Sequence, residues 1–310
     1  MAEVSMWSGS DAYLCDPELA QAFHMARVLG MPLLIEGEPG TGKTELPLQY
    51  AHSLSLDLFV YPVGSKSNVE AFVAKFDHVK YLRDSQIEVL NAQREEKGMG
   101  TKLTTSGRQT ENLDDYVNLG PAAQAYSTAD SVLLIDEIDK APREFPNDLL
   151  YALSHRKFVL PESGRVIETT EDKMPAIVIT SNREQELPTA FKGRCIYHYI
   201  AFPEPDVMRE IVLKHYPSAD DDIISKSIEI FYQLRNFGLE RSPSTRELLN
   251  WLKYMQQFAK DEAIAKIKSL DGVGALVKTQ ADIERIKRQS LGGAADSDDP
   301  PSFYGNYSNR

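Results

Sequence analysis

A glycine-rich loop, set between a short apolar run and a helical pattern, constrains this chain more than any other feature. The run over 32–36 predicts a buried strand, and residues 45–52 predict a helix. The segment between them matches the pattern GxxxxGK(S/T), in which backbone N–H groups and a helix N-terminus surround phosphate oxygens. We therefore expect a nucleotide-binding loop. Its residues are Gly37, Glu38, Pro39, Gly40, Thr41, Gly42, Lys43 and Thr44.

Three residues in and after this loop carry more specific predictions. Lys43 is expected to reach the β- and γ-phosphates of a nucleotide, and the Thr44 hydroxyl to bind Mg²⁺. A glycine-rich turn with a chance lysine is the alternative, which the predicted strand and helix on either side disfavour. Pro47 follows where a helix begins to need its backbone N–H groups, which predicts a kink or a shortened first turn.

The segment before the loop supplies a candidate wall for the base of the nucleotide. An aspartate–proline–glutamate start signal and apolar spacing predict an amphipathic helix over 17–29. Tyr13 and Leu14 lie just before this helix. They are either contacts of an adenine ring or ordinary core residues.

A second motif places two carboxylates at the end of another apolar run. Residues 132–135 are Val-Leu-Leu-Ile, and Asp136 and Glu137 follow directly. A buried parallel strand delivers such residues to its carboxyl end, where open α/β sheets bind ligands. Asp136 suits indirect or water-mediated binding of Mg²⁺, and Glu137 suits a general base that acts on the attacking water. The alternative is a core strand followed by a solvated acidic turn.

Three polar residues further along the chain extend the candidate site. Asn182 follows an apolar run over 176–180 and suits a group that orients the water and contacts the γ-phosphate. Arg194 suits an arginine finger that acts on the site of a neighbouring subunit. Arg246 lies in the first turn of a helix that starts with a capping box, where a cation opposes the helix dipole and a nucleotide phosphate would explain it. For Asn182 and Arg194 the alternatives are a simple strand-end asparagine and a surface arginine.

Overall charge and composition disfavour some classes of function. The chain has 310 residues, a net charge of −12 and a pI near 5.1. Such acidity disfavours non-specific binding to nucleic acids or membrane surfaces, which needs clustered lysine and arginine. No apolar run approaches the roughly 20 residues that span a bilayer, and we expect no signal peptide. The two cysteines form no metal-binding or disulfide pattern, so a cytoplasmic protein is expected.

The order of the patterns predicts an α/β fold with a parallel sheet, followed by an all-helical region. Within the α/β part, residues 67–93 are predicted to be helical, 94–115 are a polar insert, and 157–167 predict a hairpin. The predicted domains are a nucleotide-binding α/β domain over 1–201, a small α-helical domain over 202–291 and a disordered tail over 292–310.

Together these motifs resemble the AAA+ ATPases and, within them, the MoxR family. The resemblance covers about residues 12–290. Its most specific marks are Gly-Glu-Pro-Gly-Thr-Gly-Lys-Thr at 37–44, Gly120-Pro121, Leu-Leu-Ile-Asp-Glu-Ile-Asp-Lys at 133–140, the hairpin before Asn182, and Pro-Ser-Thr-Arg-Glu-Leu-Leu at 243–249. Ser181-Asn182-Arg183, Arg194-Cys195 and residues 276–279 look closest to the subgroup typified by CoxD, which helps to mature carbon monoxide dehydrogenase.

The resemblance implies a P-loop AAA+ fold, with a parallel five-stranded sheet flanked by helices and an all-α lid domain. By it, Lys43 and Thr44 belong to Walker A, and Asp136 and Glu137 to Walker B. Asn182 is then sensor 1, Arg194 the finger and Arg246 sensor 2. The polar insert would be the family's insert in helix 2, which faces the ring pore. Two departures from the family are Pro47 and Lys192-Gly193, which leaves Lys192 as a second candidate for a cation acting in trans.

Family members form hexameric rings and remodel protein clients with ATP and Mg²⁺, commonly with a von Willebrand factor A domain partner. We therefore expect a homo-oligomeric ATPase with a protein client, no membrane association and no nucleic acid. Two other functions stay open. One is a nucleic-acid motor on the same core, against which the acidity argues. The other is a nucleotide-gated switch, against which Glu137 and Arg194 argue, because a pure binder needs neither a base nor a finger.

Overall fold

The computed structural model describes residues 5–97, 103–104, 107–154, 156–170 and 173–292, which form two compact units. Among these residues, the first unit holds 5–8, 16–36 and 44–199, and the second holds 9–15, 37–43 and 200–292. The chain therefore enters the second unit at Gly37 and returns to the first unit at Thr44, the last residue of the glycine-rich loop.

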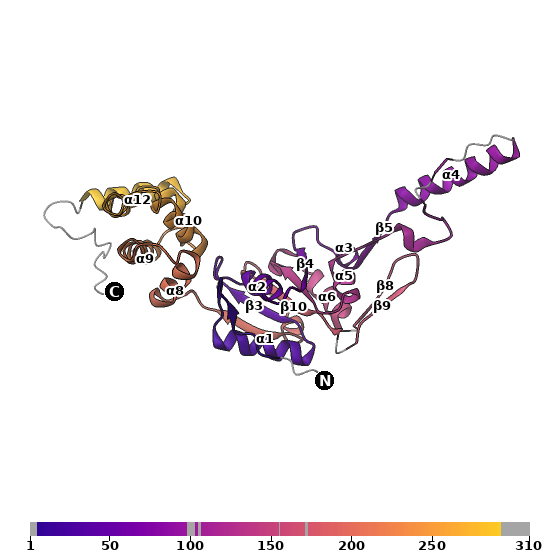
Figure 1. Cartoon of the computed structure of the whole chain (residues 1–310), viewed down its shortest axis with the longest axis horizontal. Helices are drawn as coiled ribbons and strands as arrows, with labels where there is room; N and C mark the ends of the chain where they lie inside the picture. The colour runs from indigo at the N-terminus through magenta and orange to yellow at the C-terminus, as the bar shows by residue number, and fades with distance from the viewer. Residues whose placement is uncertain (1–4, 98–102, 105–106, 155, 171–172, 293–310) are drawn as a thin grey trace. The chain divides into compact units, whose positions relative to one another are not determined.

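A five-stranded parallel sheet is the centre of the first unit, and Figure 1 labels three of its strands, β3, β4 and β10. The strand order is β11-β3-β10-β7-β4. The strands are β3 (Leu33–Gly37), β4 (Asp57–Pro62), β7 (Ser131–Asp136), β10 (Ala176–Ser181) and β11 (Ile196–Ile200). Because β3, β7 and β10 are the inner strands, they need apolar side chains on both faces, which explains their continuous runs of Leu, Ile and Val. The predicted fold class is confirmed.

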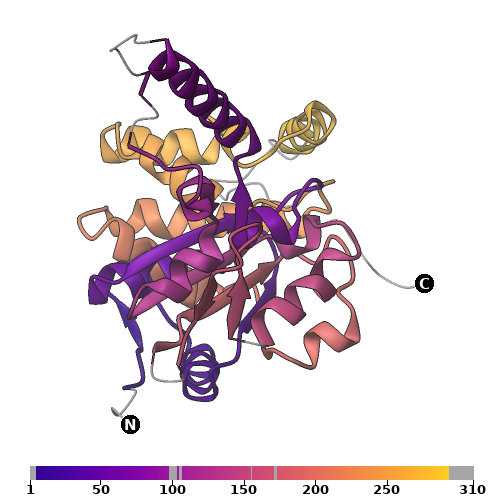
Figure 2. The ribbon, with the colours of Figure 1, turned by 90° about the vertical axis from the view of Figure 1, so that its right-hand side faces the viewer.

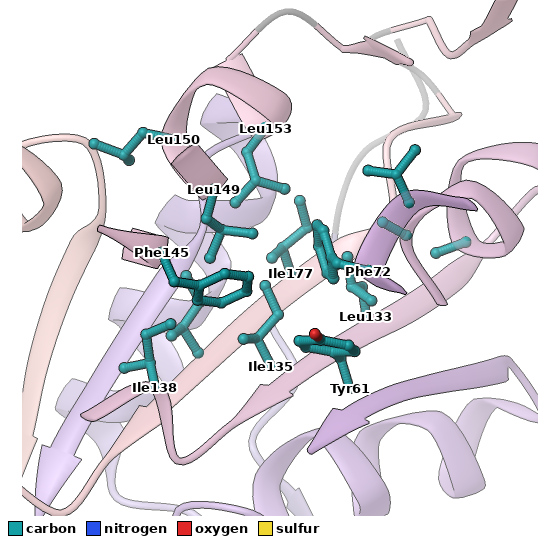
Figure 3. Close-up of a cluster of buried hydrophobic side chains, with 14 of the residues drawn as sticks. Tyr61, Phe72, Leu133, Ile135, Ile138, Phe145, Leu149, Leu150, Leu153 and Ile177 are labelled. Carbon is teal, nitrogen blue, oxygen red and sulfur yellow. The ribbon is translucent and has the colours of Figure 1, made fainter. Parts of the chain in front are cut away.

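Buried apolar side chains cover both faces of the sheet. Leu133 and Ile135 of β7 belong to one hydrophobic cluster, which also contains Phe145 (Figure 3). The alternate residues Val132 and Leu134 point to the opposite face and are only 0% and 1% exposed. Helix α1 (Pro17–Leu29) contacts β10, and helix α2 (Glu45–Leu54) contacts β7. The sheet is thus held rigidly, and its carboxyl ends can carry polar side chains at fixed positions.

The two N-terminal helices begin where their sequences predict. The Asp16 side chain accepts from the backbone N–H groups of Glu18 and Leu19, and Gly30 ends α1 in a left-handed conformation. Helix α2 runs unbroken from Glu45, so Pro47 is its third residue. Pro47 does not interrupt this helix, because the N–H groups of the first turn need no partner within it. The predicted kink stays a prediction.

The prediction that residues 67–93 are helical is confirmed only in part. The segment forms α3 (Val69–Val73), β5 (Ala74–Phe76) and α4 (His78–Glu96), and β5 pairs antiparallel with β6 (Val117–Leu119). Asn68 and Asp77 cap the two helices by accepting from the N–H groups of Ala71 and Lys80. Each cap starts a new helix, which the apolar spacing of this segment did not show.

Helix α4 and the chain that returns along it form an arm, defined here as residues 78–97, 103–104 and 107–112. Figure 1 shows α4 extending away from the sheet of the first unit, and Figure 2 shows it standing clear of that sheet from a second side. Within α4, Asp84 is the buried residue. The predicted insert over 94–115 falls partly on this arm, partly on the three residues that follow it, 113–115, and partly outside the described residues.

Short elements complete the first unit. They are η1 (Leu113–Tyr116), α5 (Pro121–Ser127), η2 (Ile138–Lys140), α6 (Phe145–Ser154), the antiparallel pair β8 (Lys157–Val159) and β9 (Val166–Glu168), and α7 (Thr189–Lys192). Helix α5 contacts β4 and β7, and α6 contacts α3 and α7.

The second unit is mainly helical and has its own hydrophobic core, which includes Phe231, Leu248 and Trp251. Its elements are the short pair β1 (Gly9–Ser10) and β2 (Tyr13–Leu14), then α8 (Pro205–His215), α9 (Asp221–Asn236), α10 (Thr245–Met255), α11 (Lys260–Lys268), η4 (Val273–Ala275) and α12 (Gln280–Gly292). The predicted tail over 292–310 lies, beyond Gly292, outside the described residues. No described helix combines the length and apolar character that crossing a membrane requires.

Candidate functional site

Strand register brings the acidic motif beside a threonine of the neighbouring strand. Ile135 of β7 pairs with Ile179 of β10, so Asp136 and Thr180 are the next residues along. The Thr180 hydroxyl donates to Asp136 Oδ1 at 2.6 Å. The Thr44 hydroxyl, from the start of α2, donates to the same oxygen at 3.0 Å. The predicted residues Thr44 and Asp136, 92 positions apart in sequence, therefore meet at the carboxyl edge of the sheet.

Glu137 is held by its main chain in a rare conformation. Its φ is 60° and its ψ 51°, in the left-handed region that costs a non-glycine residue about 1–3 kcal/mol. Its backbone N–H donates to the Thr180 hydroxyl at 2.9 Å. Thr180 thus binds the side chain of Asp136 and the main chain of Glu137 at once. Backbone strain of this kind is common at functional sites, where the contacts of the surrounding structure stabilise the strained conformation.

Both carboxylate oxygens of Glu137 have partners. The Asn182 side-chain amide donates to Oε1 at 3.2 Å, and the Lys140 ammonium donates to Oε2 at 2.7 Å. Hydrogen bonding to Glu137 raises the pKa of Lys140, so this lysine stays charged at neutral pH. The structure therefore brings the predicted base and the predicted sensor into direct contact, together with a lysine that the sequence did not single out.

Asp139 fixes the segment that carries Asn182. Its side chain is buried, and Oδ2 accepts from the backbone N–H groups of Asn182 at 3.1 Å and Glu184 at 2.9 Å. A carboxylate that accepts two backbone donors is a strong anchor for a turn. Asp139, a further residue of the acidic motif, thus fixes the backbone position of Asn182 after its strand.

A second group of polar residues surrounds Glu36, the residue before the glycine-rich loop. The Glu36 side chain is only 4% exposed and lies 3.3 Å from Lys192 Nζ and 3.6 Å from Arg183 Nε. The Tyr197 hydroxyl also donates to it at 3.1 Å. Burial, and then the charge and hydrogen bond of Glu36, raise the pKa of Tyr197. Lys192, a candidate for action in trans, is thus bound to a carboxylate of its own chain.

Arg194 lies just after α7 and is exposed. Its guanidinium donates to the backbone carbonyl of Ala190 at 3.0 Å, which holds the side chain along the end of the short helix. The neighbouring Cys195 is buried, and burial raises the pKa of its thiol to about 12. Arg194 is therefore at the surface of the first unit, where a second molecule can reach it.

Most of the glycine-rich loop lies in the second unit. Lys43 Nζ donates to the carbonyls of Gly37 and Glu38 at 2.8 Å each, and Thr41 donates to the Glu38 carbonyl at 2.9 Å. The Glu38 carboxylate forms an ion pair with Arg235 of α9 at 2.7 Å. These contacts fold the loop around its own lysine.

Gly40 has to be glycine at its position in the loop. Its φ is +81°, and a Cβ built on it would lie 2.6 Å from Ser244 Cβ. Ser244 begins α10 with the predicted capping box, in which it and Glu247 satisfy each other's backbone N–H groups. Gly40 thus packs against the start of the helix that carries Arg246.

Two further predicted contacts of the nucleotide belong to this unit. Arg246, in the first turn of α10, has an exposed side chain, which leaves it accessible to an anion. Tyr13 of β2 is buried, and its ring lies 3.4 Å from the position that a Cβ on Gly42 would take. Both remain predictions as nucleotide contacts.

The donor set fits Mg²⁺ bound together with phosphates. Thr44 and Asp136 offer a hydroxyl and a carboxylate whose oxygens lie 3.0 Å apart, and hard oxygen ligands are those that Mg²⁺ prefers. Among the described residues, no group of three or more His, Cys, Asp or Glu side chains forms a separate metal site. Mg²⁺ commonly takes only one or two protein ligands and completes its shell with phosphates and water.

Sequence reasoning missed four residues of this site: Glu36, Asp139, Lys140 and Thr180. A signal existed for two of them, because Asp139 and Lys140 continue the polar run after the acidic strand. Thr180 and Glu36 are the next-to-last residues of apolar strands, and their importance depends on the strand register, which one sequence does not show.

A parallel sheet with a glycine-rich loop after one strand and paired carboxylates after another defines a P-loop nucleoside triphosphatase. The family model of the AAA domain, dynein-related subfamily, matches residues 32–195. This match covers more than half of the chain, and the protein belongs to that AAA family. Comparison of the sequence with curated proteins found no match.

Proposed function

We propose that this protein is a MoxR-type AAA+ ATPase that hydrolyses ATP in a ring of its own subunits and uses the energy to remodel a protein client. Membership of the AAA family supports ATP-driven activity in general. The MoxR assignment rests on the motifs at 37–44, 133–140 and 243–249. The CoxD-like subgroup, and with it a task in metalloenzyme maturation, is the narrower form of the proposal.

The observation that carries the proposal is the contact of Glu137 with Asn182 beside the Thr44–Asp136 pair. In the proposed reaction, Glu137 accepts a proton from the water that attacks the terminal phosphorus of ATP. Asn182 orients that water and the γ-phosphate, and Thr44 and Asp136 hold Mg²⁺. When bound, Mg²⁺ neutralises part of the phosphate charge. A protein that only binds nucleotide has no use for a carboxylate and an amide placed together at this edge of the sheet.

The oligomeric part of the proposal depends on Arg194. Its exposed guanidinium suits stabilisation of the γ-phosphate in the site of a neighbouring subunit, and Arg246 suits the same charge within its own chain. Because a finger acts in trans, turnover per subunit must rise with protein concentration until rings are complete. A hexamer, a von Willebrand factor A domain partner and a protein client are the assembly that we propose on the MoxR resemblance.

The test is the steady-state ATPase rate per subunit as a function of protein concentration, for the wild type, Arg194→Ala and Arg288→Ala. Arg288 is 78% exposed in α12 and serves as the matched surface control. We expect the ATPase rates per subunit of the wild type and of Arg288→Ala to rise equally with protein concentration and to reach the same plateau. The ATPase rate of Arg194→Ala should stay below that of the wild type at every concentration. The expected difference is about 10³-fold or more if Arg194 acts as arginine fingers do in related reactions.

Sedimentation of the same samples separates assembly from chemistry. If Arg194→Ala assembles like the wild type but does not turn over ATP, Arg194 acts on the reaction. If wild-type turnover is independent of concentration and indifferent to Arg194, the finger assignment and the ring mechanism fail. A nucleotide-gated switch then becomes the better description.

A further inference from the structure

We infer that Lys140 is a latch on the catalytic carboxylate: it holds Glu137 in a resting position and thereby limits ATP hydrolysis until Glu137 is released. The inference rests on the proposed function, because it concerns regulation of the same site. It assigns a role to a residue that the family match and the predicted motif roles leave without one.

The backbone sets Lys140 over Glu137. Helix η2 is a single 3-10 turn that follows Glu137, and the Lys140 N–H donates to the Glu137 carbonyl at 2.9 Å. The charged ends of the two side chains meet at 2.7 Å. The left-handed conformation of Glu137 and its N–H bond to Thr180 fix the other end of the turn.

The contact competes with the chemistry that Glu137 has to perform. With Lys140 on Oε2 and the Asn182 amide on Oε1, each oxygen of the base already accepts a donor. Lys140 also holds the Glu137 carboxylate where the Asn182 amide binds it, whereas the proposed reaction needs this amide at the γ-phosphate.

The surroundings allow such a latch to open. Both side chains of the pair are 40% exposed, and an ion pair this exposed contributes little to stability. Lys140 also feels the charges of Glu184 and Asp139, so its ammonium has other acidic neighbours when it leaves Glu137. Asp139 meanwhile keeps the Asn182 segment in place through backbone N–H groups, independently of Lys140.

The test compares Lys140→Met, which removes the charge and keeps most of the side-chain length, with Lys140→Arg, which keeps the charge. Lys226 offers a matched control, since it forms an i,i+3 pair with Glu229 at 2.7 Å in α9, within the other unit. ATP turnover is measured at saturating ATP and Mg²⁺ and at fixed protein concentration. Glu137→Gln supplies the background without a base.

We expect Lys140→Met to raise kcat about twofold to fivefold, the factor that an exposed ion pair represents, with KM unchanged. Lys140→Arg and Lys226→Met should match the wild type. A merely structural role of Lys140 would lower kcat or change KM instead. An unchanged or lower kcat in Lys140→Met overturns the latch, while wild-type turnover in the same assay leaves the proposed function intact.

Two other outcomes separate the proposals. If the wild type is inactive and Lys140→Met hydrolyses ATP, the latch is supported in its strongest form. If ATP binds but neither protein hydrolyses it, the proposed ATPase function fails, and the latch fails with it.

Discussion

Thr180→Val tests whether one hydroxyl organises the acidic motif. The side chain is 1% exposed, and valine keeps its shape while it removes the oxygen. Two bonds are lost: the donation to Asp136 at 2.6 Å and the acceptance from the Glu137 N–H at 2.9 Å. A hydrogen bond to a charged group contributes about 1.5–3 kcal/mol, and a buried donor left without a partner costs about 1–3 kcal/mol.

These two contributions overlap, because Glu137 is only half-buried and water can reach part of the turn. We therefore expect the free energy of unfolding to fall by about 2.5–4 kcal/mol, in the lower half of their sum. ATP turnover should fall as well, since the left-handed turn at Glu137 loses its anchor. Urea unfolding followed by circular dichroism gives the first quantity, and phosphate release gives the second.

Thr128→Val is the matched control for this substitution. Its hydroxyl donates to the Gln124 carbonyl at 2.9 Å at the exposed end of α5, and its loss should cost about 0.5 kcal/mol or less. The reasoning is refuted if Thr180→Val unfolds at the same urea concentration as Thr128→Val and hydrolyses ATP at the wild-type rate.

Three further predictions follow from the same contacts. Glu137→Gln should keep its affinity for a fluorescent ATP analogue while kcat falls by about 10²–10⁴-fold, because the general base is lost; a comparable loss of affinity would contradict that role. Arg108 lowers the pKa of Asp84 in the folded protein, so the stabilisation is complete above the ordinary aspartate pKa and disappears as the pH falls through the lowered one. The difference in melting temperature between the wild type and Asp84→Asn should therefore be full at pH 7 and shrink in acid, and a difference that grows in acid would reverse this sign. Burial raises the pKa of Cys195 to about 12, so this thiol should resist iodoacetamide at pH 8 in the native protein and react after unfolding, as mass spectrometry of its peptide would show.

The sequence was informative where local pattern and chemistry coincide. The strand-loop-helix context predicted β3 and α2, and the apolar run before Asp136 predicted β7, because continuous apolar residues are needed on both faces of an inner strand. The Ser244 capping box was read correctly, since it depends only on residues three apart.

The sequence was less informative where a contact depends on the partner strand or on a local cap. The helical structure expected over 67–93 is interrupted because Asp77 caps a new helix after β5, and β5 exists only through its pairing with β6. Thr180 acquires its importance from the register between β10 and β7, and Glu36 from the approach of Lys192. The spacing of residues along the sequence predicts none of these three contacts.

The arm of the first unit is attached by polar and aromatic contacts rather than by a hydrophobic core of its own. At its base, Tyr81 packs against Phe76 and Tyr116, while buried Asp84 binds Arg108 at 2.8 Å. Further out, the Asn91 side chain exchanges two hydrogen bonds of 2.8 Å with the backbone of Leu103.

Apolar side chains on the arm face solvent instead, with Val79 80% and Val89 59% exposed. The arm can therefore open or change length without disturbing the packing of the sheet, as a cooperative unit of low local stability. Insertions, deletions and exchanges of the distal arm should be tolerated far better than any change of similar size in β7 or β10. Evolution can thus vary this part of the molecule while the nucleotide chemistry stays fixed.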